Sequence, residues 1–287
     1  MTSFGARLAA AMDARGPLCV GIDPHAGLLA DWGLNASAAA AREFGLRVVE
    51  AAAGRVGVVK PQVAFFERFG SAGFSALEDV IVAARSAGLL VIADAKRGDI
   101  GSTMDGYAEA WLGEGSPLES DAVTVSPYLG PDSLRGVIGA AVRGGKGVYV
   151  LAATSNPEAA GLQSAEVTTV DAERGQTVAD WVAQRAGAAN ASAVVGDDRF
   201  GPVGFVVGAT VERADLGMTD ASLRRASILA PGFGAQGARL RELPARFGPL
   251  APQVLASASR SILSAGPQGL ADAIDRHNSE LQDPSHA

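Results

Sequence analysis

The chain reads Leu89-Leu90-Val91-Ile92-Ala93 and then, without a break, Asp94-Ala95-Lys96-Arg97-Gly98-Asp99. An apolar run of this length predicts a strand buried on both faces, as in a parallel sheet. Side chains alternate along a strand, so Asp94 and Lys96 point the same way, and the turn at Gly98 can bring Asp99 back toward them. We therefore expect an ammonium group between two carboxylates at the mouth of this strand.

Such a cluster has a chemical use. Two carboxylates beside a lysine favour its protonated form, which makes the lysine a positioned acid. An ordinary surface ion pair is the alternative interpretation, since exposed pairs are common and contribute little. Only three of the 24 Lys and Arg residues are lysines, namely Lys60, Lys96 and Lys146. Because lysine can be tuned to donate a proton while guanidinium stays charged, a lysine kept in an arginine-rich chain favours the chemical interpretation.

Short apolar runs of this kind recur along the chain, at 18–22, 56–59, 89–93, 122–125, 147–151, 203–207, 227–230 and 254–256. Alanine-rich segments with helical spacing lie between them, at 38–53, 74–87, 132–143, 174–188 and 236–247. Eight strands alternating with helices predict an α/β fold, a (β/α)8 TIM barrel in a single domain. A doubly wound open sheet is less favoured, because no Gly-x-Gly-x-x-Gly follows the first strand. We expect the barrel over residues 1–276 and a frayed polar tail over 277–287.

Composition narrows the class of protein. The chain is 48% hydrophobic and 19% charged, and its net charge of −7 argues against general affinity for nucleic acid. No apolar run approaches the length of a membrane span, and charges at Arg7, Asp13 and Arg15 interrupt the start, so a cytoplasmic protein is expected. Cys19 lies in an apolar run and is expected in the core. The histidines have no ligand spacing, so we predict no metal site.

Polar residues follow most of the predicted strands, and barrel enzymes place their chemistry at the carboxyl ends of the strands. Asp23 follows the first strand, Lys60 the second, and Thr154-Ser155-Asn156-Pro157 the fifth. A glycine-rich loop at 231–237 follows the seventh, and Ser259-Arg260-Ser261 follows the eighth. Backbone N–H groups of such a loop, beside an arginine, are typical of a phosphate site. The sequence thus predicts a phosphate site on the rim that carries the charged cluster.

The chain resembles the orotidine 5′-phosphate decarboxylase family, and within it the longer bacterial type, the type 2 subfamily. The matching motifs span nearly the whole barrel: Gly21-Ile22-Asp23-Pro24, Lys60-Pro61-Gln62, the stretch from Asp94 to Thr103, Pro127-Tyr128-Leu129-Gly130, Pro231-Gly232 and Arg260. The extended Asp-x-Lys-Arg-Gly-Asp-Ile signature is highly specific. The resemblance implies conversion of orotidine 5′-phosphate to uridine 5′-phosphate, the last step of de novo pyrimidine nucleotide synthesis. It further implies a homodimer that needs no cofactor.

The resemblance also assigns roles to residues. The catalytic residues that it implies are Lys60, Asp94, Lys96 and Asp99, with Asp99 supplied by the neighbouring subunit and Lys96 protonating C6 of the pyrimidine. The substrate-binding residues that it implies are Asp23, Ile100, Thr103, Ser155, Gln236 and Arg260. Asp23 and Lys60 would hold ribose hydroxyls, which Asp99 and Thr103 would reach across the dimer interface. Ser155 would address the pyrimidine edge, and Gln236 and Arg260 the phosphate.

The chemistry explains why this reaction needs such residues. Loss of CO2 from C6 leaves an electron pair in the ring plane that the π-system cannot simply delocalise, so preorganised charge such as the Lys96 ammonium must stabilise it. Asp94 would lie near the departing carboxylate, and whether it destabilises that group or orients Lys96 is left open.

Two other functions remain as alternatives. A metal-dependent sugar-phosphate decarboxylase or aldolase of a related barrel usually has an acidic residue where the second strand ends, and Lys60 at that position opposes a cation site. A noncatalytic nucleotide-phosphate-binding barrel needs the phosphate loop but has no use for the charged cluster on the other side of the rim.

Overall fold

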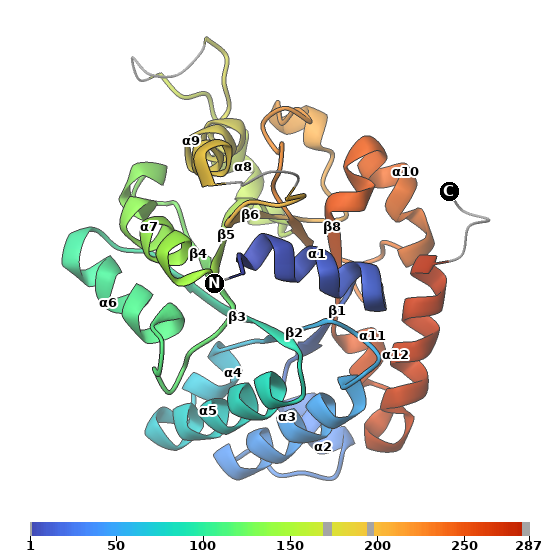
Figure 1. The fold of residues 1–287 in the computed structure, drawn as a ribbon. Coiled ribbons are helices and arrows are strands. Elements are labelled where there is room, and N and C mark those ends of the chain that lie inside the picture. Colours follow the sequence, from blue (N-terminus) through green and yellow to red (C-terminus); the bar gives the residue numbers. More distant parts are fainter. Residues whose placement is uncertain (1, 169–173, 194–197, 283–287) are drawn as a thin grey trace.

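The computed structural model describes residues 2–168, 174–193 and 198–282, and within them eight parallel strands close into a barrel (Figure 1). The strands are β1 Leu18–Ile22, β2 Val58–Pro61, β3 Leu90–Arg97, β4 Ala122–Val125, β5 Gly147–Ala153, β6 Val203–Val207, β7 Ile228–Ala230 and β8 Val254–Ala258. Each strand pairs with the next in the chain, and β8 pairs with β1. The predicted (β/α)8 TIM barrel is confirmed.

Helices surround the strands in alternation with them. The longer ones are α1 Phe4–Arg15, α3 Ala38–Ala52, α5 Gly70–Ser86, α6 Gly101–Leu112, α7 Arg135–Gly144, α9 Val178–Ala193 and α12 Gly266–Gln282. The shorter ones are α2 Ala26–Asp31, α4 Ala64–Glu67, α8 Ala160–Gln163, α10 Leu243–Phe247 and α11 Arg260–Leu263, and 3-10 turns η1 to η5 lie at Pro131–Leu134, Pro157–Ala159, Arg213–Leu216, Leu240–Glu242 and Gly248–Gln253. None of the helices in these described ranges combines the length and apolarity needed to cross a bilayer.

Several predicted bounds differ from the observed ones, and two of these differences have a local explanation. The helix predicted over 236–247 begins only at η4 and α10, because Gly237 has a φ of 102° and ends the preceding loop in a conformation no helix adopts. The tail predicted over 277–287 is helical as far as Gln282, where α12 ends. His277 Nδ1 donates to the Ala273 carbonyl at 2.7 Å, and the Asn278 amide donates to the Arg15 carbonyl at 2.9 Å. These bonds anchor α12 beyond the boundary expected at residue 276; residues 283–287 lie outside the described ranges.

Helix α1 closes the amino-terminal end of the barrel, and Figure 1 shows it crossing that opening. Its Phe4, Leu8 and Met12 pack against apolar side chains of the barrel interior. The rings of Phe4 and Tyr149 meet edge to face, with 6.1 Å between their centroids. Cys19 is buried in the same cluster, and burial raises the pKa of its thiol to about 12, which fits the expected core role. Because apolar side chains seal this end, a polar ligand finds room at the opposite rim.

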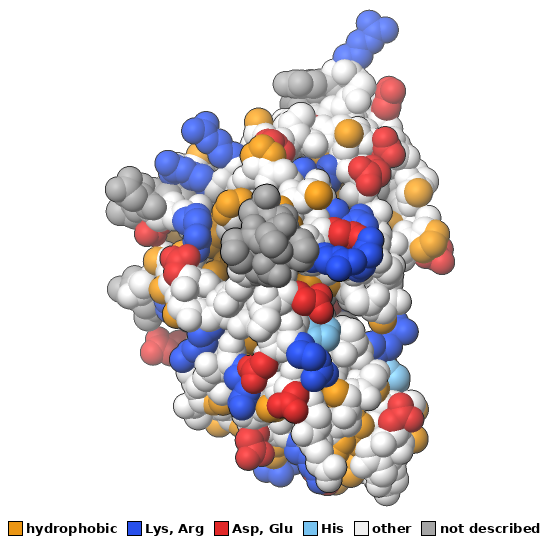
Figure 2. Space-filling view, turned by 90° about the vertical axis from the view of Figure 1, so that its right-hand side faces the viewer, with side chains coloured by type: hydrophobic (Ala, Val, Ile, Leu, Met, Phe, Trp, Pro, Cys, Tyr) orange, Lys and Arg blue, Asp and Glu red, His pale blue; other side chains and the backbone are white. Residues whose placement is uncertain are grey.

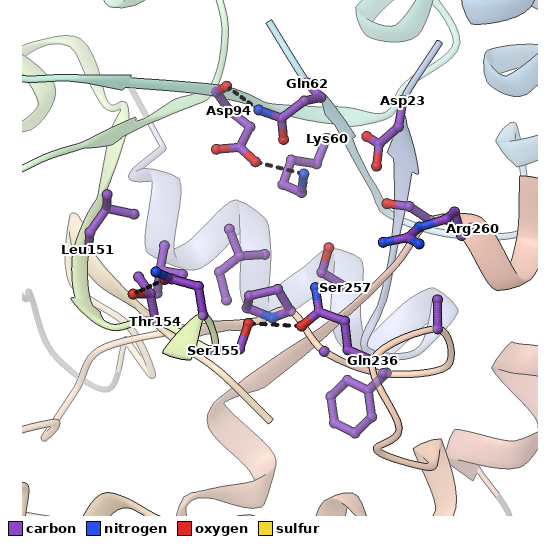
Figure 3. A pocket seen from close by; sticks show the side chains of 18 of the residues that line it. Asp23, Lys60, Gln62, Asp94, Leu151, Thr154, Ser155, Gln236, Ser257 and Arg260 are labelled. Carbon is purple, nitrogen blue, oxygen red and sulfur yellow. Dashed lines mark hydrogen bonds and ion pairs between the residues drawn. The ribbon is translucent and has the colours of Figure 1, made fainter. Parts of the chain in front are cut away.

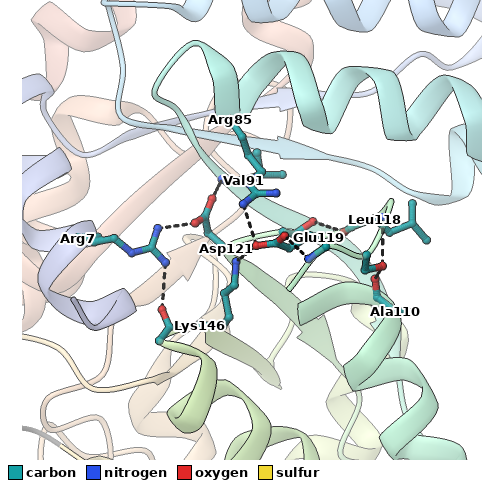
Figure 4. A network of polar contacts seen from close by, with 12 residues as sticks. Arg7, Arg85, Val91, Ala110, Leu118, Glu119, Asp121 and Lys146 are labelled. Carbon is teal, nitrogen blue, oxygen red and sulfur yellow. Dashed lines mark hydrogen bonds and ion pairs between the residues drawn. The ribbon is translucent and has the colours of Figure 1, made fainter. Parts of the chain in front are cut away.

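The third lysine belongs to a buried ion network near the amino-terminal ends of β4 and β5 (Figure 4). Lys146 Nζ donates to Glu119 Oε1 at 2.7 Å, Arg85 donates to the same oxygen at 2.8 Å, and the Gly115 N–H donates to Oε2 at 2.9 Å. Lys146 and Glu119 are only 8% and 9% exposed. Beside them, Arg7 pairs with Asp121, whose Oδ2 accepts from the Val91 N–H at 2.9 Å. Lys146 is therefore a structural lysine, at the end of the barrel opposite the predicted site.

Glu119→Gln is expected to lower the free energy of unfolding by about 3–5 kcal/mol, because it leaves the Lys146 ammonium buried without its anion. The matched control is Glu43→Gln, which breaks an exposed pair with Arg47 and should cost less than about 1 kcal/mol. Denaturant unfolding at pH 7 measures both. Equal losses of unfolding free energy in the two variants would show that the buried network stabilises the fold no more than an exposed ion pair does.

The pH dependence of the same contribution follows from the Glu119 pKa. Burial alone would raise that pKa, but the hydrogen bonds from Lys146 and Gly115 lower it from 4.5 to about 2. A lowered folded-state pKa contributes stability above the unfolded value of 4.5, and this contribution disappears as the pH falls through about 2. The stability difference between wild type and Glu119→Gln should therefore shrink between these pH values.

The face that carries α10 and α12 is shown in Figure 2. Basic and acidic side chains are intermingled on it, and hydrophobic side chains occur in small separate groups. Glu242, for example, pairs with both Arg239 and Arg246. Opposite charges mixed in this way are typical of a solvated surface and give no single-sign field over this face.

Candidate active site

A cavity of about 410 Å³ opens at the carboxyl ends of the strands (Figure 3). Of the predicted site residues, it is lined by Asp23, Lys60, Asp94, Lys96, Ser155, Gln236 and Arg260. Leu151, Val206, Leu229 and Phe233 supply apolar lining. The cavity therefore combines a charged group of side chains with an apolar part, as expected for a site that binds a small molecule with both polar and apolar parts.

Asp94 is the centre of the charged group. Its Oδ1 accepts from Lys96 Nζ at 2.6 Å, and its Oδ2 accepts from Lys60 Nζ at 2.9 Å. The side chain of Lys96 is 46% exposed, whereas those of Lys60 and Asp94 are 8% and 10% exposed. The Lys96 ammonium is thus the member of the group most accessible from the cavity, as a proton donor to a bound ligand must be.

The charges stabilise one another inside the barrel. Burial alone would lower the pKa of Lys60, but the carboxylates of Asp94 and then Asp23 outweigh it and raise that pKa above its ordinary value. Burial alone would raise the pKa of Asp94, but the ammonium groups of Lys60 and Lys96 hold it below its ordinary range. Lys60 and Asp94 are therefore both charged at neutral pH.

The opposite side of the cavity carries hydroxyl, amide and guanidinium groups. Ser155 Oγ donates to Gln236 Oε1 at 2.8 Å, which joins the loop after β5 to the loop after β7. Ser155 also packs closely against Gly208, where a Cβ would lie 2.8 Å from Ser155 Cβ. Arg260 is exposed and forms no ion pair with any residue in the described ranges. An arginine at the cavity wall without a protein anion is available to an anionic ligand.

Asp23 also has unused capacity for hydrogen bonding. Its Oδ1 is buried and has no partner among the described residues. Buried carboxylate oxygens are normally hydrogen-bonded, so this atom points to a donor supplied by a ligand. A sugar hydroxyl is a donor of the right kind.

Three predicted site residues do not line this cavity: Asp99, Ile100 and Thr103. The carboxylate of Asp99 accepts from the Ile100 N–H at 2.8 Å, at the start of α6. The convergence of Asp99 with Asp94 and Lys96 expected from the strand geometry is therefore not seen within one chain, because β3 continues through Arg97 before the chain turns. Ile100 is 62% exposed, and the nearby rim residues Tyr128 and Leu129 are 77% and 52% exposed.

Two neutral partners of Asp94 are not among the site residues predicted from the sequence. Thr124 Oγ1 donates to Asp94 Oδ1 at 3.0 Å. With its amide nitrogen facing the carboxylate, Gln62 donates to Oδ2 at 2.7 Å and its amide oxygen accepts from Lys96 Nζ at 3.3 Å. Thr124 and Gln62 are polar residues in or directly after predicted strands, but the sequence does not indicate which face of the strand each occupies. Each oxygen of Asp94 thus accepts from one ammonium and one neutral donor.

Metal-ligating side chains do not gather in the described part of the chain: no three His, Cys, Asp or Glu residues there could hold an ion together. In the cavity, the two carboxylates of Asp23 and Asp94 flank the Lys60 ammonium, which opposes a divalent cation between them.

This chain is similar in sequence and in structure to known proteins of one family. The model of the orotidine 5′-phosphate decarboxylase / HUMPS family matches residues 16–271. Orotidine 5′-phosphate decarboxylase of Streptomyces coelicolor is 50% identical over 284 residues, which cover 98% of each chain. A crystal structure of a Streptomyces avermitilis protein is 49% identical with a TM-score of 0.90, covering 98% of this chain and 95% of that one. Leishmania donovani OMP decarboxylase is 32% identical with a TM-score of 0.75, covering 98% of both. The chain therefore belongs to the orotidine 5′-phosphate decarboxylase / HUMPS family.

Proposed function

We propose that this protein decarboxylates orotidine 5′-phosphate to uridine 5′-phosphate without a metal or cofactor. The observation that carries this proposal is the Lys60 ammonium, held 2.9 Å from Asp94 at the end of β2. It neutralises the carboxylate that a metal-dependent barrel enzyme would use as a ligand. The full-length relatives that carry the decarboxylase name support the same choice within the family.

In the proposed reaction, the C6–carboxylate bond breaks, CO2 leaves, and its bonding electron pair stays on C6 in the ring plane. The Lys96 ammonium stabilises this charge as it develops and then transfers a proton from Nζ to C6. Lys96 regains its proton from water after product release. Asp94, held by Lys60 on its other oxygen, fixes the Lys96 Nζ from which the proton departs.

The remaining lining residues fit the rest of the nucleotide. Asp23 and Lys60 hold the ribose hydroxyls. Ser155 addresses the pyrimidine edge, and Gln236, which accepts a hydrogen bond from Ser155, addresses the phosphate. Arg260 binds the phosphate. Binding energy from the phosphate, far from C6, helps catalysis by fixing the base against Lys96.

We also propose that the site is shared within a homodimer. Asp99, Ile100 and Thr103 lie outside the cavity of their own chain, and the exposed apolar side chains of Ile100, Tyr128 and Leu129 favour a protein contact at this rim. In this arrangement Asp99 and Thr103 reach the ribose bound to the partner, and Ile100 contacts the same substrate. We expect the dimer, as a type 2 enzyme of pyrimidine nucleotide synthesis, to act in the cytoplasm.

The test follows the loss of orotidine 5′-phosphate absorbance with purified protein in excess EDTA. Full turnover under chelation is expected, with uridine 5′-phosphate and CO2 formed in equal amounts. Activity that appears only when Mg²⁺ is restored would select the metal-dependent relatives. Binding of uridine 5′-phosphate without any turnover would select a noncatalytic nucleotide-binding barrel.

Arg260→Ala should weaken uridine 5′-phosphate binding by about 1.5–3 kcal/mol, the scale of a charge-assisted hydrogen bond, and leave uridine binding almost unchanged. Calorimetric titration with both ligands measures the difference. The control is Arg224→Ala, since Arg224 is an exposed arginine at a separate surface hollow. An equal loss for uridine and its phosphate would place Arg260 away from the phosphate.

A further inference from the structure

The strand that carries Asp94 and Lys96 is irregular at these residues. Between two matched positions, β3 advances from Ala93 to Arg97 while β4 advances only from Val123 to Val125. The surplus residues on β3 form a bulge, a feature that often re-aims side chains next to active sites. Lys96 lies in this bulge with a φ of 49°, in the left-handed region that non-glycine residues rarely adopt. A contact from the surrounding structure must hold the Lys96 backbone in this left-handed conformation.

The Thr124 side chain supplies the contact. Its Oγ1 accepts the backbone N–H of Lys96 at 2.9 Å. The same oxygen donates its proton to Asp94 Oδ1 at 3.0 Å. A hydroxyl has a single proton, so the anion of Asp94 fixes its direction and leaves a lone pair for the Lys96 N–H. Thr124 is completely buried and does not line the cavity.

The Thr124 hydroxyl therefore joins the Lys96 backbone to the Asp94 carboxylate, the two groups that determine where the Lys96 ammonium lies. Asp94 Oδ1, which Thr124 contacts, is also the oxygen that holds Lys96 Nζ at 2.6 Å. Thr124 thus fixes Lys96 at both ends, through its backbone N–H and through the carboxylate that holds its ammonium. Val123 and Val125, the neighbours of Thr124 in β4, have no hydroxyl and cannot make these hydrogen bonds in its place.

We propose that Thr124 is a positioning residue for the proton-donating lysine, acting through this bridge between the Lys96 backbone and Asp94. The catalytic part of the proposal rests on the proposed decarboxylase function. The bridge itself does not, because it can be observed in the protein without substrate.

The test compares Thr124→Val, which keeps the shape but loses the hydroxyl, with Thr124→Ser, which keeps the hydroxyl. Thr124→Val should lower kcat by about 100-fold, the scale of a misplaced catalytic group, with uridine 5′-phosphate affinity within about twofold of wild type. Thr124→Ser should keep kcat within about threefold of wild type. The matched control is Thr177→Val, because Thr177 Oγ1 also bridges two groups, the Asp180 N–H and the Leu216 carbonyl, at 3.2 and 2.5 Å. It does not line the cavity, so its loss should leave kcat unchanged.

A second measurement is independent of activity. Hydrogen exchange followed by NMR should show the Lys96 amide protected in wild type and Thr124→Ser and exchanging freely in Thr124→Val. Wild-type kcat in Thr124→Val, equal losses in the valine and serine variants, or rapid exchange of the wild-type Lys96 amide would each overturn the proposal. Exchange of the wild-type Lys96 amide tests the proposed bridge even if Thr124→Val does not fold. A wild-type protein inactive on orotidine 5′-phosphate with a protected Lys96 amide would instead refute the decarboxylase function and leave the bridge established.

Discussion

Lys96→Ala is expected to lower kcat by more than about 10⁴-fold, because it removes both the general acid and the charge that stabilises the C6 electron pair. The fold should survive, since Asp94 keeps the Lys60 ammonium as a buried partner. Steady-state decarboxylation measures the loss, and circular dichroism with uridine 5′-phosphate binding establishes that the variant is folded and its site open.

Lys96→Arg separates the two roles of the lysine. Guanidinium keeps the charge but is a poor proton donor, and its planar shape cannot place a donor where Nζ lies, 2.6 Å from Asp94 Oδ1. We therefore expect Lys96→Arg to recover little of the activity lost in Lys96→Ala. Activity in Lys96→Arg close to wild type would show that positive charge alone suffices, and the assignment of Lys96 as proton donor would then be wrong.

Lys60→Ala and Asp99→Ala homodimers are each expected to be nearly inactive, and mixing them should restore activity. In a dimer of one chain of each kind, one site has lost both residues and the other is intact. After unfolding and refolding equal amounts together, random assortment makes about half of the dimers mixed, so about a quarter of wild-type activity should return. Steady-state assays before and after mixing measure the recovery.

The matched control mixes Lys60→Ala with Asp94→Ala. Both residues line the cavity of their own chain, so no mixed dimer has an intact site and no activity should return. Native mass spectrometry establishes that subunits have exchanged. If exchange is complete and the Lys60→Ala and Asp99→Ala mixture stays inactive, Asp99 acts within its own chain and the shared site is wrong.

Much of the fold follows from local patterns in the sequence. The runs at 18–22, 122–125 and 203–207 are observed as strands with the same bounds, because strands buried on both faces must be apolar throughout. Strand β3 runs past its apolar stretch to Arg97, since Asp94 and Lys96 line the cavity and Arg97 pairs with Val125 of β4. The helix predicted over 236–247 begins only at Leu240, because the apolar spacing continues across Gly237, whose φ of 102° no helix adopts.

The site was predictable where it rests on residues at strand ends. Lys60, Asp94 and Lys96 meet because the carboxyl ends of parallel strands share one rim. Thr124 and Gln62 could not be identified from the sequence as partners of Asp94. Their hydrogen bonds depend on the bulge in β3 and on the orientation of the Gln62 amide. In the proposed dimer the role of Asp99 depends on a second chain, which the pattern of one chain does not describe.

Proton exchange at C6 of uridine 5′-phosphate is a direct measure of proton transfer by Lys96. By microscopic reversibility, the group that gives a proton to C6 also removes it, so the wild-type protein should exchange the C6 proton for deuterium in D2O. Proton NMR follows the C6 signal, with the ribose C1′ proton as internal reference. We expect exchange with wild type and none with Lys96→Arg at saturating ligand. Exchange by Lys96→Arg at the wild-type rate, or none by a wild-type protein that decarboxylates, would contradict proton transfer by Lys96.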